Sequence, residues 1–191
     1  TNPTLFGPDA NALLGWALAV AGILVALTVP AIGQWTDRSG KRNTSLTIAT
    51  IGVVIIMALL FFVKPDGGGF YMWLGLILLA LGNIIFETGS VVYNSMVTDV
   101  STPKTVGRVS GFGWGMGYVG GIVLLAILYV GFIAPDVGWF GVTSKDGQNI
   151  RVSMIICGVW TLLFTIPTFL TLKDWPRTQR PPRTNPVEAS R

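Results

Sequence analysis

Apolar residues run through this chain in long blocks that are separated by short clusters of charged residues. One block, between Asp66 and Asp99, contains a single charged residue, Glu87. Four others contain none, and they lie between Asp9 and Asp37, Arg42 and Lys64, Arg108 and Asp136, and Arg151 and Lys173. A helix needs about 20 apolar residues to cross the hydrocarbon core of a bilayer. Each block is therefore long enough for one crossing.

The blocks are apolar all round and do not alternate with a period of two, which favours helices over the strands of a barrel. The sequence predicts an all-α membrane protein with about five transmembrane helices in one bundle over residues 11–172. We expect the helices at residues 11–35, 44–63, 70–98, 103–133 and 151–172. Residues 1–10 precede this bundle, and residues 173–191 form a basic, Pro-rich tail.

Composition narrows the classes of function. Only 12% of the residues are charged, against about 25% in soluble domains, and there is no histidine. Cys157 is the single cysteine, so no Cys/His cluster can hold a metal and no His-based catalysis is available. No nucleotide-binding motif with its Lys-Ser/Thr pair is present. We therefore expect no metal, no cofactor and no enzymatic activity.

Lysine and arginine are distributed unevenly over the connections. If the helices alternate in direction, three segments share one face. They contribute three, two and five lysines and arginines, so that face carries ten cations. The other face carries three, namely Lys64, Lys145 and Arg151. By the positive-inside rule, the face with ten cations is cytoplasmic. The tail is then cytoplasmic, residues 1–10 are extracytoplasmic, and the net charge of +4 reflects topology and not nucleic-acid binding.

The connection between the first two predicted helices has the form G-x-x-x-D-R-x-G-K-R. Its residues suit a conformational latch, because glycine permits close helix approach or a tight turn and a carboxylate at the membrane edge favours a neighbouring helix N-terminus. The motif residues are Gly33, Asp37, Arg38, Gly40, Lys41 and Arg42. The alternative is an ordinary basic loop that only fixes topology.

A polar stripe marks the third predicted helix. Asn83, Glu87, Ser90 and Asn94 are spaced at i, i+4, i+7 and i+11, with Tyr93 beside them, so they share one helical face. A carboxylate at membrane depth normally faces a bundle interior or a water-filled cavity. We interpret these five residues as candidates for binding a proton or the amine of a substrate. The alternative is a helix-packing face in which a protonated or paired Glu87 makes interhelical hydrogen bonds.

Two further groups of residues flank this stripe. Asp99 ends the same helix and Arg108 begins the next, where they could form a cytoplasmic gate with Asp37 or Arg38, or only a solvated salt bridge. The fourth predicted helix carries glycines at intervals of four, which allow close helix approach in lipid. We predict helix packing at Gly111, Gly113, Gly115, Gly117 and Gly121.

The motif at residues 33–42 resembles the signature loop of the major facilitator superfamily. The stretches at residues 93–103 and 107–115 resemble one branch of it, which includes fungal vacuolar amino-acid effluxers linked to autophagy and many bacterial permeases. The resemblance implies that this sequence holds helices two to six of a twelve-helix bundle, a partial N-terminal half. It further implies a bacterial inner-membrane location, and partners that comprise the lipid bilayer, the first helix, and a C-terminal half or a partner protein.

The leading functional hypothesis is secondary active or facilitative transport of a small solute by alternating access, with a proton or ion as a coupling partner. Amino acids are implied as solutes by the resemblance alone. The alternative hypothesis is a non-transporting membrane scaffold or assembly subunit that keeps a transporter fold.

Overall fold

The computed structural model describes residues 8–64, 68–171 and 174, without the side chains of residues 8–11, 37 and 68. Within these residues five helices are long and apolar enough to cross a membrane, as the sequence predicts. They are α1 (Pro8–Ser39), α2 (Arg42–Leu60), α3 (Gly68–Val97), α4 (Val106–Leu128) and α5 (Gln148–Thr171). Most of residues 1–10 and 173–191, for which sidedness is predicted, lie outside the described residues.

Some helix boundaries differ from the expected ones, and that of α1 changes the interpretation of the motif. α1 continues to Ser39, so most of the G-x-x-x-D-R-x-G-K-R segment is helical and the turn is confined to Gly40 and Lys41. α4 is followed directly by one π-helical turn, Tyr129–Ile133. α5 begins at Gln148, right after a short 3-10 turn, Lys145–Gly147. The motif is therefore an extension of a membrane helix and not a free loop.

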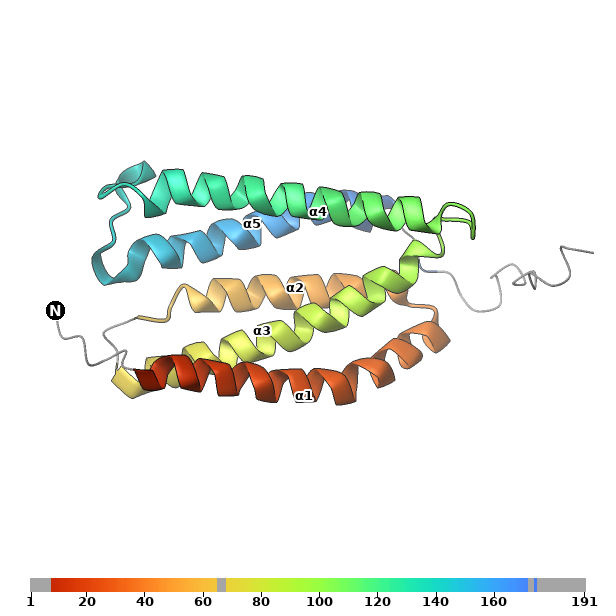
Figure 1. The fold of residues 1–191 in the computed structure, drawn as a ribbon, viewed down its shortest axis with the longest axis horizontal. Coiled ribbons are helices and arrows are strands. Elements are labelled where there is room, and N and C mark those ends of the chain that lie inside the picture. The colour runs from red at the N-terminus through yellow and green to blue at the C-terminus, as the bar shows by residue number, and fades with distance from the viewer. Residues whose placement is uncertain (1–7, 65–67, 172–173, 175–191) are drawn as a thin grey trace, which may run out of the picture.

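The helices lie side by side and alternate in direction (Figure 1). The α1–α2 and α3–α4 connections share one end of the bundle, which we call the motif end (residues 38–45, 98–105 and 174). α3 packs along both α1 and α2, and α2 packs in addition along α5. α4 makes only sparse contacts with α3 and α5. A groove is consequently left between α3 and α4.

Close approach of α2 and α3 depends on small residues at their interface. A Cβ built on Gly89 would lie 3.2 Å from the Cβ of Ala49, and one built on Gly82 would lie 3.1 Å from Ile56. Beside these positions Leu46, Val92 and Met96 form the buried apolar cluster. Outward-facing side chains are largely apolar, with Trp16 and Leu170 more than 70% exposed. A surface of this kind is suited to the hydrocarbon of a bilayer.

Candidate functional site

The polar stripe lies on the side of α3 that turns away from the buried cluster with α2. Asn83, Glu87 and Ser90 are half-buried, whereas Tyr93 and Asn94 are exposed. Among the described side chains, Glu87 has no hydrogen bond or salt bridge to another residue. Glu87, which its spacing had singled out, is therefore a carboxylate within a membrane-spanning helix. No lysine or arginine pairs with it in the part of the chain described.

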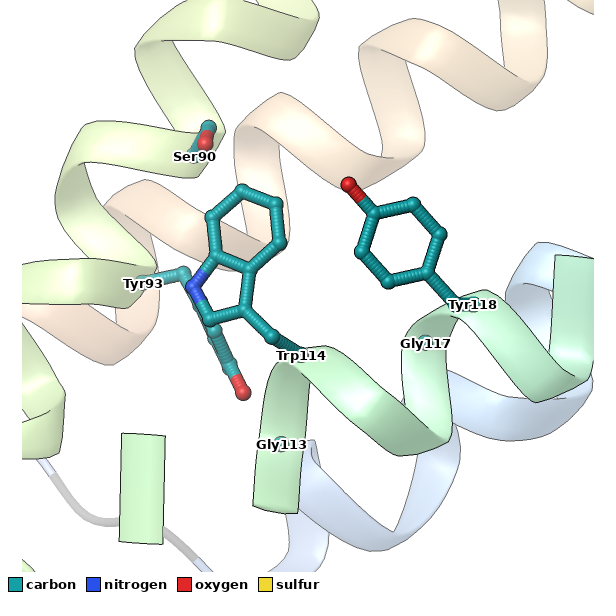
Figure 2. A pocket seen from close by; sticks show the side chains of 6 residues that line it. All are labelled: Ser90, Tyr93, Gly113, Trp114, Gly117 and Tyr118. Atoms are coloured by element: carbon teal, nitrogen blue, oxygen red, sulfur yellow. The ribbon is translucent and has the colours of Figure 1, made fainter. Parts of the chain in front are cut away.

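One cavity of about 360 Å³ separates α3 from α4. Ser90 and Tyr93 line it from α3, and Gly113, Trp114, Gly117 and Tyr118 line it from α4. In Figure 2 the Trp114 indole extends from α4 toward Ser90 and Tyr93. The rings of Trp114 and Tyr118 follow one another along α4 with centroids 6.3 Å apart. Aromatic rings, hydroxyl-bearing side chains and two glycines therefore form the walls of this cavity.

A second cavity of about 420 Å³ lies between α2, α3 and α5 and shares Ser90 and Tyr93 with the first. The two cavities are thus parts of one groove. Thr161 and Thr165 line it from α5, and each hydroxyl donates to the backbone carbonyl four residues earlier, at 2.8 and 2.6 Å. Because these protons are engaged, the hydroxyl oxygens can offer lone pairs to the groove. No charged side chain lines either cavity.

The structure brings together some predicted site residues and leaves others apart. Ser90 and Tyr93 line the groove, whereas Asn83, Glu87 and Asn94, which share a helical face with Ser90, line neither cavity. The sequence analysis did not single out Trp114, Tyr118 or the α5 threonines. Their spacing held a signal, since Trp114 and Tyr118 are four residues apart and Thr161, Thr165 and Thr168 recur at i, i+4 and i+7.

Of the five glycines of α4 predicted to pack against another helix, Gly113 lies beside a side chain of α3. A Cβ on Gly113 would lie 2.9 Å from the hydroxyl oxygen of Tyr93. A Cβ on Gly111, Gly115, Gly117 or Gly121 would meet nothing within 4 Å. Close helix packing at these four glycines therefore stays a prediction.

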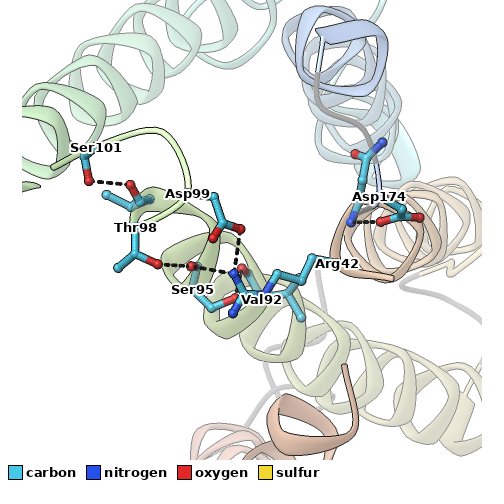
Figure 3. A network of polar contacts seen from close by, with 9 residues as sticks. Arg42, Val92, Ser95, Thr98, Asp99, Ser101 and Asp174 are labelled. Atoms are coloured by element: carbon cyan, nitrogen blue, oxygen red, sulfur yellow. Dashed lines mark hydrogen bonds and ion pairs between the residues drawn. The ribbon is translucent and has the colours of Figure 1, made fainter. Parts of the chain in front are cut away.

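The motif end is organised around the first residue of α2 (Figure 3). The Arg42 guanidinium is buried and donates to the Asp99 carboxylate at 2.6 Å and to the Ser95 carbonyl at 3.2 Å, both on or just after α3. Gly40 has a φ of +71°, a conformation that favours glycine in this turn. The chain thus pairs Asp99 with Arg42, whereas Arg38, Lys41 and Arg108 are exposed. The side chain of Asp37 lies outside the description.

The chain is similar to several known proteins. The family model described as "Vacuole effluxer Atg22 like" matches residues 97–190. An uncharacterized MFS-type transporter of Bacillus subtilis, YxiO, is 26% identical over 160 residues, which is 83% of this chain and 36% of that protein. Autophagy-related protein 22 of Yarrowia lipolytica is 28% identical over 111 residues, 57% of this chain and 17% of that protein.

A third similarity is to autophagy-related protein 22-1 of Neosartorya fischeri, 32% identical over 83 residues, which is 40% of this chain and 12% of that protein. This chain therefore spans about a third or less of the length of these curated relatives. No solved structure matches it.

Proposed function

Since this chain belongs to the branch of the major facilitator superfamily that includes the Atg22-like vacuole effluxers, we propose that it forms part of a transmembrane carrier of a small polar solute. Five helices place it in a bilayer as a multi-pass protein. Alternating access, in which the solute site opens to each side of the membrane in turn, is the mechanism that we assign to it.

The observation that carries this proposal is the half-buried carboxylate of Glu87 on a face of α3 that borders the groove. A charge at membrane depth costs a few kcal/mol or more unless water, a proton, a cation or a protein partner compensates it. No described side chain does so, which leaves an aqueous path, a bound proton or cation, or a partner outside the described residues. A carrier accounts for the first two of these.

The residues around this face suit different parts of a small solute. Glu87 would hold an ammonium group or a coupling proton, with the carboxamides of Asn83 and Asn94 on the same face as hydrogen-bonding partners. Tyr93 and Trp114 would contact the apolar part of the solute. Amino acids have both kinds of group, and we propose them as the substrate class.

Replacement of Glu87 tests this assignment directly. In proteoliposomes that contain the purified protein, Glu87→Gln should reduce the uptake of radiolabelled amino acids at least tenfold, because the amide keeps the shape and removes the charge. Asp136→Asn is the matched control, since Asp136 is exposed in the connection between α4 and α5, and it should transport normally. Wild-type uptake by Glu87→Gln would show that Glu87 is a packing residue.

The open glycines of α4 favour one second candidate, a scaffold subunit whose groove is filled by another membrane protein. A cysteine at Ser90 in a Cys157→Ser background separates the two functions. A carrier should expose this thiol to a charged, water-soluble thiol reagent in membranes. A scaffold with a protein-filled groove should protect it from that reagent.

A further inference from the structure

The start of α2 is capped by a residue from far along the chain. Lys41 stands at the N-cap position and makes no side-chain capping hydrogen bond. The Asp174 carboxylate accepts instead, from the backbone N–H of Asn43 at 2.7 Å and from that of Thr44 at 3.2 Å, and also from the Thr44 hydroxyl (Figure 3). These N–H groups have no partner within the helix, and a negative charge is favourable at a helix N-terminus.

The other end of α2 is held by a residue of opposite charge. Arg151 donates from Nε to the backbone carbonyl of Phe61, the C-cap residue of α2. Its guanidinium carbon also lies 4.7 Å from the centroid of the Phe61 ring, in a cation–π arrangement. The last carbonyls of a helix lack partners within it, and a cation is favourable at that end.

Both capping residues belong to the α5 segment. Arg151 lies in the first turn of α5 (Gln148–Thr171), and Asp174 lies three residues beyond the end of that helix. Since α2 and α5 run in opposite directions, the α5 segment supplies a cation and an anion to the matching ends of the α2 dipole. Between these ends the helices are in van der Waals contact, because a Cβ on Gly158 would lie 3.7 Å from Met57 and Val54.

We propose that Arg151 and Asp174 are positioning residues that clamp α5 onto both ends of α2 and make the two helices one rigid unit. α3 is held at the start of α2 by different contacts, namely the Arg42–Asp99 ion pair and the buried cluster of Leu46, Val92 and Met96. A rearrangement at the motif end should therefore move α2 and α5 together. This inference does not depend on which solute is carried.

Thermal unfolding of the purified protein in detergent tests the two contacts without any transport assay. Asp174→Asn and Arg151→Gln should each lower the Tm by about 3 °C, the shift expected from loss of one helix-capping interaction in a chain of this size. Asp136→Asn and Lys145→Gln make the same chemical changes at exposed positions before α5 and should leave the Tm unchanged. Equal Tm values for the four variants would overturn the proposal.

A covalent bridge tests rigidity itself. Thr44→Cys and Asp174→Cys, in a Cys157→Ser background, would be joined by a disulfide or by a short bifunctional thiol reagent. If the two helices move as one, the bridged protein should recover the wild-type Tm and transport as fast as its reduced form. Transport that stops on bridging and returns on reduction would show that this contact opens, and a bridged protein that fails to fold would equally overturn the clamp.

Discussion

At the scale of single residues, the motif end contains the ion pair of the buried Arg42. The Arg42 side chain is 9% exposed, and the guanidinium donates to both the Asp99 carboxylate and the Ser95 carbonyl. Loss of one charged hydrogen-bond partner from a buried cation is costly, although the exposure of Asp99 moderates the effect. We expect Asp99→Asn to lower the free energy of unfolding by about 1.5 kcal/mol, measured by denaturant titration in detergent.

Two comparisons check this interpretation. Arg38→Ala removes an exposed motif arginine and should change the free energy of unfolding by less than about 0.5 kcal/mol. The exchanged pair Arg42→Asp with Asp99→Arg should not recover stability, since an aspartate at position 42 cannot donate to the Ser95 carbonyl. Full recovery in the exchanged protein would show that charge alone matters here.

Gly113 offers a prediction about the wall of the groove. A methyl group there would lie 2.9 Å from the Tyr93 hydroxyl oxygen, which must move. Inside a helix Ala is otherwise favoured over Gly by up to about 1 kcal/mol, so Gly113→Ala should be less stabilising than Gly117→Ala, and Tyr93→Phe should reduce this difference by removing the hydroxyl. Gly117→Ala is the matched control, because nothing lies within 4 Å of its Cβ. Equal Tm changes at the two glycines would contradict the assigned contact.

At the scale of elements, the helices follow from the sequence because their signal is local. Runs of apolar residues free of charges, such as that between Arg42 and Lys64, are long enough to cross a membrane, and their backbone groups must be satisfied within the helix. The extent of α1 was harder to predict. Polar motif residues up to Ser39 look like a loop by composition, yet they continue the helix past the apolar run.

The turn that ends α1 carries the next prediction. Gly40 has a φ of +71°, where a side chain adds about 1 kcal/mol of strain. Gly40→Ala should lower the Tm of the protein accordingly. Gly33→Ala, in the same motif, should be nearly neutral, because its Cβ would make an ordinary 3.5 Å contact with Val91. A larger Tm loss for Gly33→Ala would mean that helix approach, and not turn geometry, is what the motif glycines provide.

At the scale of the whole molecule, the pairing of helices could not be predicted from the sequence. Asp174 and Thr44 are 130 residues apart, and Arg151 and Phe61 are 90 residues apart. No local periodicity connects them. The charges of Asp174 and Arg151 stand at the ends of predicted spans, where charged residues usually indicate topology. The sequence analysis accordingly counted Arg151 only toward the orientation of the bundle. For the same reason the stripe that contains Glu87 was predictable from spacing on one helix, whereas the groove that requires Trp114 and Thr161 from two others was not.

The orientation of the bundle is the remaining whole-molecule prediction. Ten lysines and arginines fall on the predicted cytoplasmic face and three on the other, so the motif end should face the cytoplasm. Single cysteines at Lys41 and Lys145, both exposed positions at opposite ends of the bundle, test this in a Cys157→Ser background. A membrane-impermeant maleimide should label Lys41→Cys only in inside-out vesicles and Lys145→Cys only in right-side-out vesicles.

The reverse labelling pattern would have a specific consequence. It would place the Arg42–Asp99 pair and the Asp174 cap at the outer face, so that any gate formed there would control the external opening of the groove and not the internal one. Labelling of both cysteines from both sides would instead indicate mixed insertion, which is expected only if the charge bias is too weak to set orientation. Because the sequence assigns seven more cations to one face than to the other (ten against three), a single orientation is the outcome that the electrostatics favour.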